Sequence, residues 1–225
     1  MSTPSQRPGP DVGPLAVLKR VRSVTQPRPG ERCDLCAVGI PDDHTHVVNL
    51  ETRELLCSCQ ACYLLFVSGS AGNLRAVPER YLALMGFSLT QAQWDALQVP
   101  VSVAFLFSNS RQEDIAAFYP SPAGATECLL PLGAWDEITA THTVLRELLP
   151  DVEAALVHVE KDVSECFVVP IDICYELVGV LRKLWRGFDG GKEAQEALAA
   201  FFDRVRSRAK PVASGILEGS EGLNA

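Results

Sequence analysis

Five cysteines lie within a thirty-residue stretch near the start of the chain, and they are its strongest chemical signal. Cys33 and Cys36 form one C-x-x-C pair, and Cys59 and Cys62 form a second. Two such pairs separated by a short stretch are typical of a site in which four thiolates bind one tetrahedral metal ion. We therefore predict that these four residues bind Zn²⁺, against the alternative that they are buried, reduced thiols.

Three further residues are rival ligands for the same ion. Cys57 lies two residues before Cys59, so it either replaces one of the four cysteines or is a buried thiol. His44 and His46 precede the segment that joins the two pairs, and imidazole is also a common zinc ligand. The alternative for each histidine is a surface position on a hairpin. The sequence leaves these alternatives open.

Iron is the chemical rival of zinc. A rubredoxin-like centre also uses two C-x-x-C turns, which usually carry glycine directly after the second cysteine because glycine eases the backbone around the sulfurs. Here Ala37 and Tyr63 occupy those positions. The pattern therefore favours zinc over a rubredoxin-like centre, with an iron–sulfur cluster as a further alternative.

Few residues outside the cysteine cluster are placed to do chemistry. His158 and Glu160 alternate along a predicted strand and would share a face, which would suit acid–base catalysis, although a solvated strand face explains them equally well. Cys128, Cys166 and Cys174 stand in apolar contexts that are typical of buried thiols. Because nucleophile-elbow, phosphate-loop and dinucleotide-binding motifs are missing from the sequence, nothing in it specifies an enzyme.

The segment between the cysteine pairs must bring them together. Residues 46–50 and 53–57 have the pattern of two strands around a tight turn, and we expect a helix capped by Ser58 to follow. Residues 62–67 are apolar enough for this helix to enter the main core. We assign residues 33–75 to a cysteine-rich metal-binding module that resembles a treble-clef zinc finger.

Residues 76–210 have the pattern of an α+β domain. Alternating apolar positions predict strands over residues 101–107, 115–119, 126–130, 154–160 and 166–169. Apolar stripes at spacings of three and four predict a short helix ending near Leu97 and longer helices over residues 135–149, 173–188 and 198–205. Because short turns join neighbouring strands, we predict an antiparallel sheet with helices mainly on one face.

The two ends of the chain, residues 1–32 and 211–225, are expected to be disordered tails. The first is Pro-rich and basic, whereas the whole chain has a net charge of −8. The rest of the chain is therefore acidic, which disfavours general nucleic-acid binding because that needs a cationic surface. No apolar run approaches the roughly 18–20 residues of a membrane span, and no secretory signal is recognisable, so we expect a cytoplasmic protein.

Several stretches together resemble an uncharacterised protein family that accompanies nickel–iron hydrogenase genes in actinobacteria. They are RCDLC at 32–36, HTHVVNLETRELLCSCQACYLLF at 44–66, and VPIDICYELVGVLRKLWRGFDGG at 169–191. The resemblance covers most of residues 32–208 and leaves out both tails. It implies a role near hydrogenase assembly, stability or electron handling, and it transfers no catalytic residue.

These observations lead us to expect an accessory or adaptor protein with a structural zinc site. It would bind hydrogenase subunits or maturation proteins through its surface, with no nucleic acid and no membrane span involved. One alternative is a rubredoxin-like iron redox carrier that serves the hydrogenase, and another is an enzyme of unassigned reaction.

Overall fold

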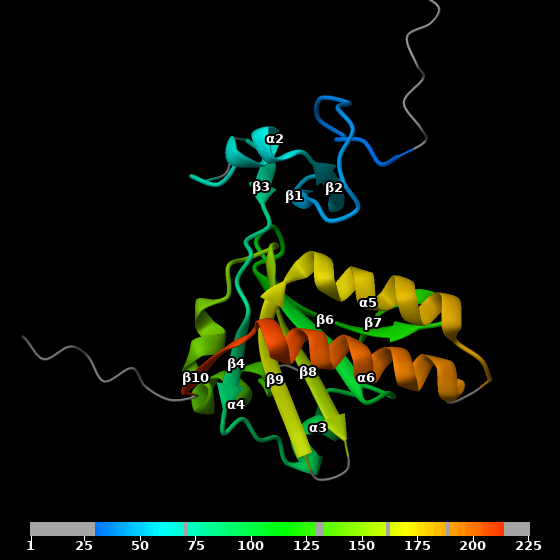
Figure 1. Ribbon diagram of the computed structural model, residues 1–225. Helices are drawn as coiled ribbons and strands as arrows, with labels where there is room; N and C mark the ends of the chain where they lie inside the picture. Colours follow the sequence, from blue (N-terminus) through cyan, green and yellow to red (C-terminus); the bar gives the residue numbers. More distant parts are fainter. Residues whose placement is uncertain (1–29, 70–71, 129–132, 161–162, 188–189, 214–225) are drawn as a thin grey trace, which may run out of the picture.

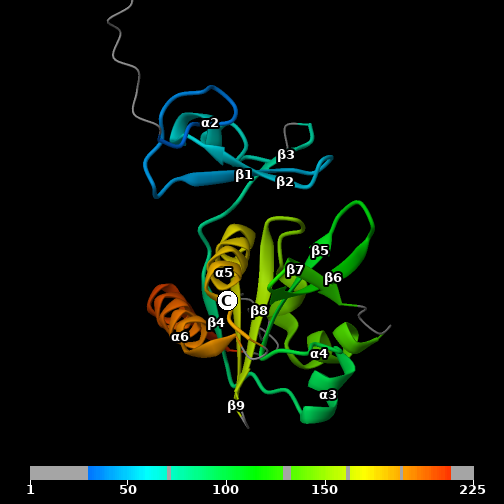
Figure 2. The same ribbon diagram turned by 90° about the vertical axis from the view of Figure 1, so that its right-hand side faces the viewer.

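The computed structural model describes residues 30–69, 72–128, 133–160, 163–187 and 190–213. These residues form a small three-stranded sheet that lies over one end of a larger, seven-stranded sheet (Figure 1 and Figure 2). The two predicted tails lie mostly outside the described residues. Among the described residues, no helix has both the length and the apolar character needed to cross a membrane.

The small sheet carries the cysteine-rich part of the chain. Its strands are β1 (Thr45–Asn49), β2 (Glu54–Ser58) and β3 (Leu74–Ala76), and both neighbouring pairs run antiparallel, in the order β2-β1-β3. The β1–β2 hairpin follows the sequence prediction. A short helix of five residues, α2 (Gln60–Leu64), comes directly after the hairpin. Its N-cap is Cys59, one residue later than the predicted cap, Ser58.

The large sheet has the strand order β10-β4-β9-β8-β5-β6-β7. Its strands are β4 (Leu82–Met85), β5 (Val103–Asn109), β6 (Asp114–Ser121), β7 (Gly124–Cys128), β8 (Glu153–Glu160), β9 (Val163–Pro170) and β10 (Lys210–Ala213). All neighbouring pairs are antiparallel except the edge pair β10–β4, which is parallel. The sheet is therefore mixed rather than wholly antiparallel. Residues 211–213, assigned to the tail from sequence, belong to this edge strand.

Helices cover both faces of the large sheet. The two long helices, α5 (Ile171–Leu184) and α6 (Gly191–Arg208), pack on one face, where Phe105 and Leu156 are fully buried. The short elements α3 (Gln91–Ala96), α4 (Ala134–Thr141) and a 3₁₀ helix (Thr143–Glu147) cover the other face. Strand residues alternate between the two cores, as the period of a strand requires. The prediction of helices mainly on one face thus holds for the two long helices and misses the second layer.

The predicted helix over residues 135–149 is interrupted at His142. This residue ends α4 with φ −116° and ψ 74°, and the 3₁₀ helix starts directly after it. Its side chain is buried, packs against Phe87 and donates from Nε2 to the carbonyl of Ser88 at 3.4 Å. The apolar stripe was correct, but its spacing does not distinguish one long helix from two short ones.

The small sheet is joined to the large domain through side chains as well as through the chain itself. Val48 of β1 is buried in the same core as α5. Nδ1 of His46 donates to Oδ2 of Asp172 in the first turn of α5 at 2.8 Å. Arg75 of β3 donates to the carbonyl of Pro150 at 2.8 Å. These contacts fix the cysteine-rich sheet over the start of α5.

Candidate metal centre

Cys33, Cys36, Cys59 and Cys62 converge on one point. Their sulfurs all lie within 4.8 Å of one another, and the Sγ atoms of Cys36 and Cys59 are 3.7 Å apart. A tetrahedral zinc ion with Zn–S bonds of about 2.3 Å holds its sulfurs about 3.8 Å apart. All four cysteines are free thiols rather than disulfides. The four residues thus form a group that can bind a metal ion, and both the donor set and its spacing fit a tetrahedral one.

The first cysteine pair lies on a tight backbone turn. Ala37 has a positive φ of 60° and donates its N–H to the carbonyl of Cys33 at 2.8 Å. The N–H of Cys33 in turn donates to the carbonyl of Val38 at 2.9 Å. The left-handed bend that glycine usually supplies in such a turn is therefore made by alanine, at some cost in backbone strain.

The second pair lies at the start of α2. Cys59 is the N-cap residue, and its sulfur accepts the backbone N–H of Cys62 at 3.5 Å. The unpaired N–H groups of a helical first turn carry partial positive charge, which stabilises thiolates placed beside them. This pair is therefore built on a helix rather than on a second tight turn.

Asp34 fastens the first turn to the hairpin. Its backbone N–H donates to the carbonyl of Cys57 at 2.8 Å, and its Oδ2 accepts the N–H of Cys57 at 2.7 Å. These two hydrogen bonds hold the Cys33–Cys36 turn against the end of β2, from which Cys59 follows. The sequence showed the two cysteine pairs, but it did not show that Asp34, which lies between Cys33 and Cys36, helps to bring them together.

The thiols of Cys33 and Cys62 have pKa values that are shifted in opposite directions. Burial acts to raise the pKa of Cys33, but hydrogen bonds from the backbone N–H groups of Cys59, Leu35 and Cys36 outweigh it and lower this pKa to about 6. The pKa of Cys62 is raised to about 12, first by its hydrogen bond with Cys36 and then by burial. A cation bound by all four would lower the pKa of every ligand, because metals bind the thiolate form.

The three rival ligands do not join this group. His44, His46 and Cys57 form a group of their own, with ligand atoms that lie within 4.8 Å of one another. The hairpin accounts for this arrangement, because His46 and Cys57 face each other directly across β1 and β2. Only Cys59 of the 57–59 segment turns toward the four-cysteine group.

The sequence model of a family of unknown function, DUF5947, matches residues 32–209. The chain belongs to this family. No curated protein and no solved structure matches the chain significantly. The matched region of the DUF5947 chain contains both groups of metal-ligating side chains and every strand of the large sheet except β10 (Lys210–Ala213).

The other candidate side chains from the sequence, His158 and the three remaining cysteines, are packed or paired within the fold. His158 faces Glu165 across β8 and β9, with 3.7 Å between Nδ1 and Oε2, and its ring stacks on Phe202 of α6. Burial lowers the pKa of His158, and Glu165 is held by Arg206. The predicted pairing with Glu160 is thus replaced by a cross-strand pair covered by a helix. Cys128, Cys166 and Cys174 are buried, as predicted.

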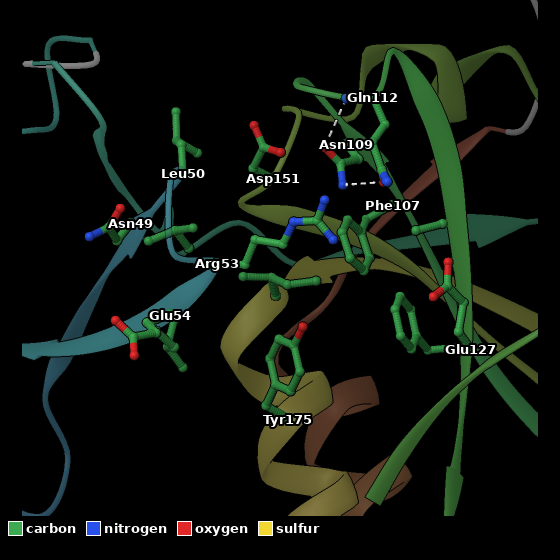
Figure 3. A pocket seen from close by; sticks show the side chains of 15 residues that line it. Asn49, Leu50, Arg53, Glu54, Phe107, Asn109, Gln112, Glu127, Asp151 and Tyr175 are labelled. Atoms are coloured by element: carbon green, nitrogen blue, oxygen red, sulfur yellow. Dashed lines mark hydrogen bonds between the residues drawn. The ribbon is translucent and has the colours of Figure 1, made fainter.

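A cavity lies where the hairpin meets the large domain (Figure 3). Arg53 extends from the hairpin turn toward Phe107 of β5, with Tyr175 of α5 and Asp151 also lining the space. The volume of this cavity, about 100 Å³, is well below the several hundred Å³ typical of sites for organic ligands. The cavity is better described as a gap in the packing between the two sheets than as a cofactor site.

Two functional or structural contacts were not foreseen from the sequence. The carboxylate of Asp172, in the first turn of α5, accepts a hydrogen bond from His46, 126 residues away in the chain. Glu153 is fully buried and accepts hydrogen bonds from Arg80. Neither pairing leaves a local pattern, because each joins segments that only the tertiary fold brings together.

Proposed function

We propose that this protein is a cytoplasmic accessory or adaptor protein for a nickel–iron hydrogenase, and that Cys33, Cys36, Cys59 and Cys62 bind a structural zinc ion. It would act by binding hydrogenase subunits or maturation proteins during assembly or in the stable enzyme. The hydrogenase part of this proposal rests on the sequence resemblance described above. The zinc and binding parts rest on the geometry of the module.

The placement of the second cysteine pair is the observation that supports zinc over a rubredoxin-like iron centre. A rubredoxin-like site is built from two tight turns. Ala37 gives the first pair such a turn, but Cys59 and Cys62 instead occupy the N-cap and first turn of α2. A turn, a hairpin and a helix start in that order make a treble-clef-like zinc site. With four thiolates as ligands, the ion would be closed to substrates and purely structural.

The module also presents apolar side chains to solvent, which supports a binding role. Leu64 is 57% exposed, Leu65 69% and Val67 54%, and Val38 beside the first cysteine turn is 51% exposed. The sequence predicts that the apolar run after Cys62 enters the main core, but these side chains lie at the surface. Its exposure is costly in water, and an exposed apolar cluster commonly marks a surface that another protein covers.

Placing two charges on this surface is expected to abolish partner capture without loss of the fold. In the Leu64→Asp/Leu65→Asp variant, co-purification with tagged hydrogenase subunits or maturation proteins should fall at least tenfold, because each carboxylate would be desolvated in the complex. The matched control is Val163→Asp, which charges a 63% exposed residue at the far end of the large sheet.

Equal recovery of hydrogenase components with the wild type and the double variant would rule out this surface as the binding site. Normal hydrogenase assembly and activity in a strain that lacks the protein would contradict the hydrogenase role itself. Purified protein that contains stoichiometric iron and absorbs visible light would favour the redox-carrier alternative.

A further inference from the structure

We infer that His44, His46 and Cys57 form a second metal site, which binds a divalent transition-metal ion through two imidazoles and one thiolate. This site is separate from the four-cysteine group and does not depend on the proposed hydrogenase role. The ligand atoms of the three residues lie within 4.8 Å of one another, a spacing that one ion can bridge.

The hairpin presents these three side chains on one face. His46 and Cys57 are direct cross-strand partners, so their side chains leave the sheet on the same side. His44 lies two residues before His46 along the chain and therefore shares that side. The two imidazole rings lie 4.7 Å apart at an angle of 50°, so they converge rather than stack.

Both imidazoles are oriented by hydrogen bonds from the same ring atom. Nδ1 of His46 donates to Oδ2 of Asp172 at 2.8 Å, and Nδ1 of His44 donates to the carbonyl of Pro41 at 2.9 Å. Metal-binding histidines typically donate one ring N–H to a carboxylate or a carbonyl, which fixes the tautomer and leaves the other nitrogen free to bind the ion. Here that nitrogen is Nε2 in both residues.

His44 supplies an independent sign that a ligand is bound. Its side chain is only 7% exposed, yet its Nε2 atom is buried and has no hydrogen-bond partner among the described residues. A buried polar atom left unpaired costs about 1–3 kcal/mol, so such atoms usually have a partner. A metal ion shared with His46 and Cys57 would provide one.

The surroundings favour a cation and leave room for a further ligand. A hollow of about 360 Å³ borders both histidines and is lined by more acidic than basic side chains. The acidic residues are Glu31, Asp42, Asp43, Glu79, Asp172 and Glu176, and Arg208 is the basic one. Two of the three proposed ligands, His44 and His46, line this hollow. A set of three protein ligands leaves the fourth position of the ion for water or a small external ligand, unlike the closed four-cysteine site.

The ligand set defines the class of metal. Two imidazoles and a thiolate suit borderline ions such as Zn²⁺, Co²⁺, Ni²⁺ and Cu²⁺, whereas Mg²⁺ and Ca²⁺ prefer oxygen. Co²⁺ is the practical probe, because a cobalt–thiolate bond gives a charge-transfer absorption band that reports on Cys57.

A cobalt titration of the full-length protein, purified with one equivalent of zinc, tests the second site. We expect one further equivalent of Co²⁺ to bind, with a thiolate charge-transfer band that saturates at one-to-one stoichiometry. Cys57→Ser and His46→Gln should each lose this equivalent and keep the zinc. His158→Gln, a histidine change remote from the hairpin, should keep both ions. Asp172→Asn should weaken cobalt binding about 10–100-fold, since it removes the group that orients His46.

The inference would be overturned if the wild type bound no second equivalent of Co²⁺, Zn²⁺, Ni²⁺ or Cu²⁺ at saturating concentration. It would equally be overturned if Cys57→Ser and His46→Gln bound the second equivalent with unchanged affinity. The wild-type stoichiometry needs no variant, so a variant that fails to fold does not remove the test.

Discussion

Replacing Cys59 with serine is expected to release the ion from the four-cysteine site and to unfold both parts of the chain that the ion joins. Structural zinc contributes on the order of 10 kcal/mol to the folding of such modules. Helix α2 has five residues, none of them buried, and a helix that short is not stable alone. Hydrogen exchange followed by mass spectrometry should show loss of protection over residues 33–40 and 59–66, with the large sheet still protected.

The control for this experiment is Cys128→Ser. Cys128 lies in β7, outside both metal groups, and its thiol donates to the carbonyl of Ala117 at 3.2 Å, a hydrogen bond that a serine hydroxyl can also make. This variant should keep its metal and its exchange protection in the module. If Cys59→Ser bound as many equivalents of metal as the wild type and kept full protection of α2, the four-cysteine assignment would be wrong.

Arg80→Ala is expected to lower the free energy of unfolding by about 3 kcal/mol or more, because it leaves a buried carboxylate without its cation. Glu153 is fully buried at the start of β8. Its Oε1 accepts from Nε of Arg80 at 2.6 Å, and its Oε2 accepts from Arg80 and from the backbone N–H of Leu149 at 2.9 Å. Equilibrium unfolding in urea, monitored by circular dichroism, measures the change.

An exposed ion pair provides the comparison for Arg80. Arg204 and Glu176 join α6 to α5, and both side chains are about half exposed, so Arg204→Ala should cost less than about 1 kcal/mol. Restoring a neutral core with Arg80→Met/Glu153→Gln should recover part of the loss seen in Arg80→Ala. If Arg80→Ala and Arg204→Ala lowered the free energy of unfolding by similar amounts, the buried ion pair would stabilise the fold no more than the exposed one.

Local patterns explain which parts of the fold the sequence predicts. The β1–β2 hairpin, the strand pair β8–β9 and the helices α5 and α6 each carry a complete signal within their own residues, either an alternation of two or a stripe of three and four. The short helix α3 was predicted from the apolar spacing that ends near Leu97, and in the structure Thr90 and Gln93 form a capping box at its start. The four cysteines were visible for the same reason, since their pairing is a matter of spacing.

The features that the sequence missed depend on contacts between distant segments. Strand β10 is four residues long, contains Pro211 and lies at a sheet edge, so its residues show no strand pattern. Residues 62–67 are apolar as a core helix would be, yet Leu64 and Leu65 face solvent. Composition alone cannot distinguish an apolar run that packs inside from one that is left for a partner.

The second group of potential ligands was only partly predicted from the sequence. His44, His46 and Cys57 were recognised as ligands, but only as rivals for the four-cysteine ion. The hairpin register pairs His46 with Cys57, and these residues belong with His44 to a group separate from the four cysteines. The remaining part of the site is Asp172, and its approach to His46 is a property of how α5 meets the small sheet.

X-ray absorption spectroscopy at the zinc edge tests the four-cysteine site most directly. The His44→Ala variant is the suitable sample, because removing a ligand of the second group leaves a single ion to observe. We predict a first shell of four sulfur atoms at about 2.3 Å from the zinc. A first shell that contains nitrogen or oxygen, or a purified protein without a stoichiometric metal ion, would contradict the account.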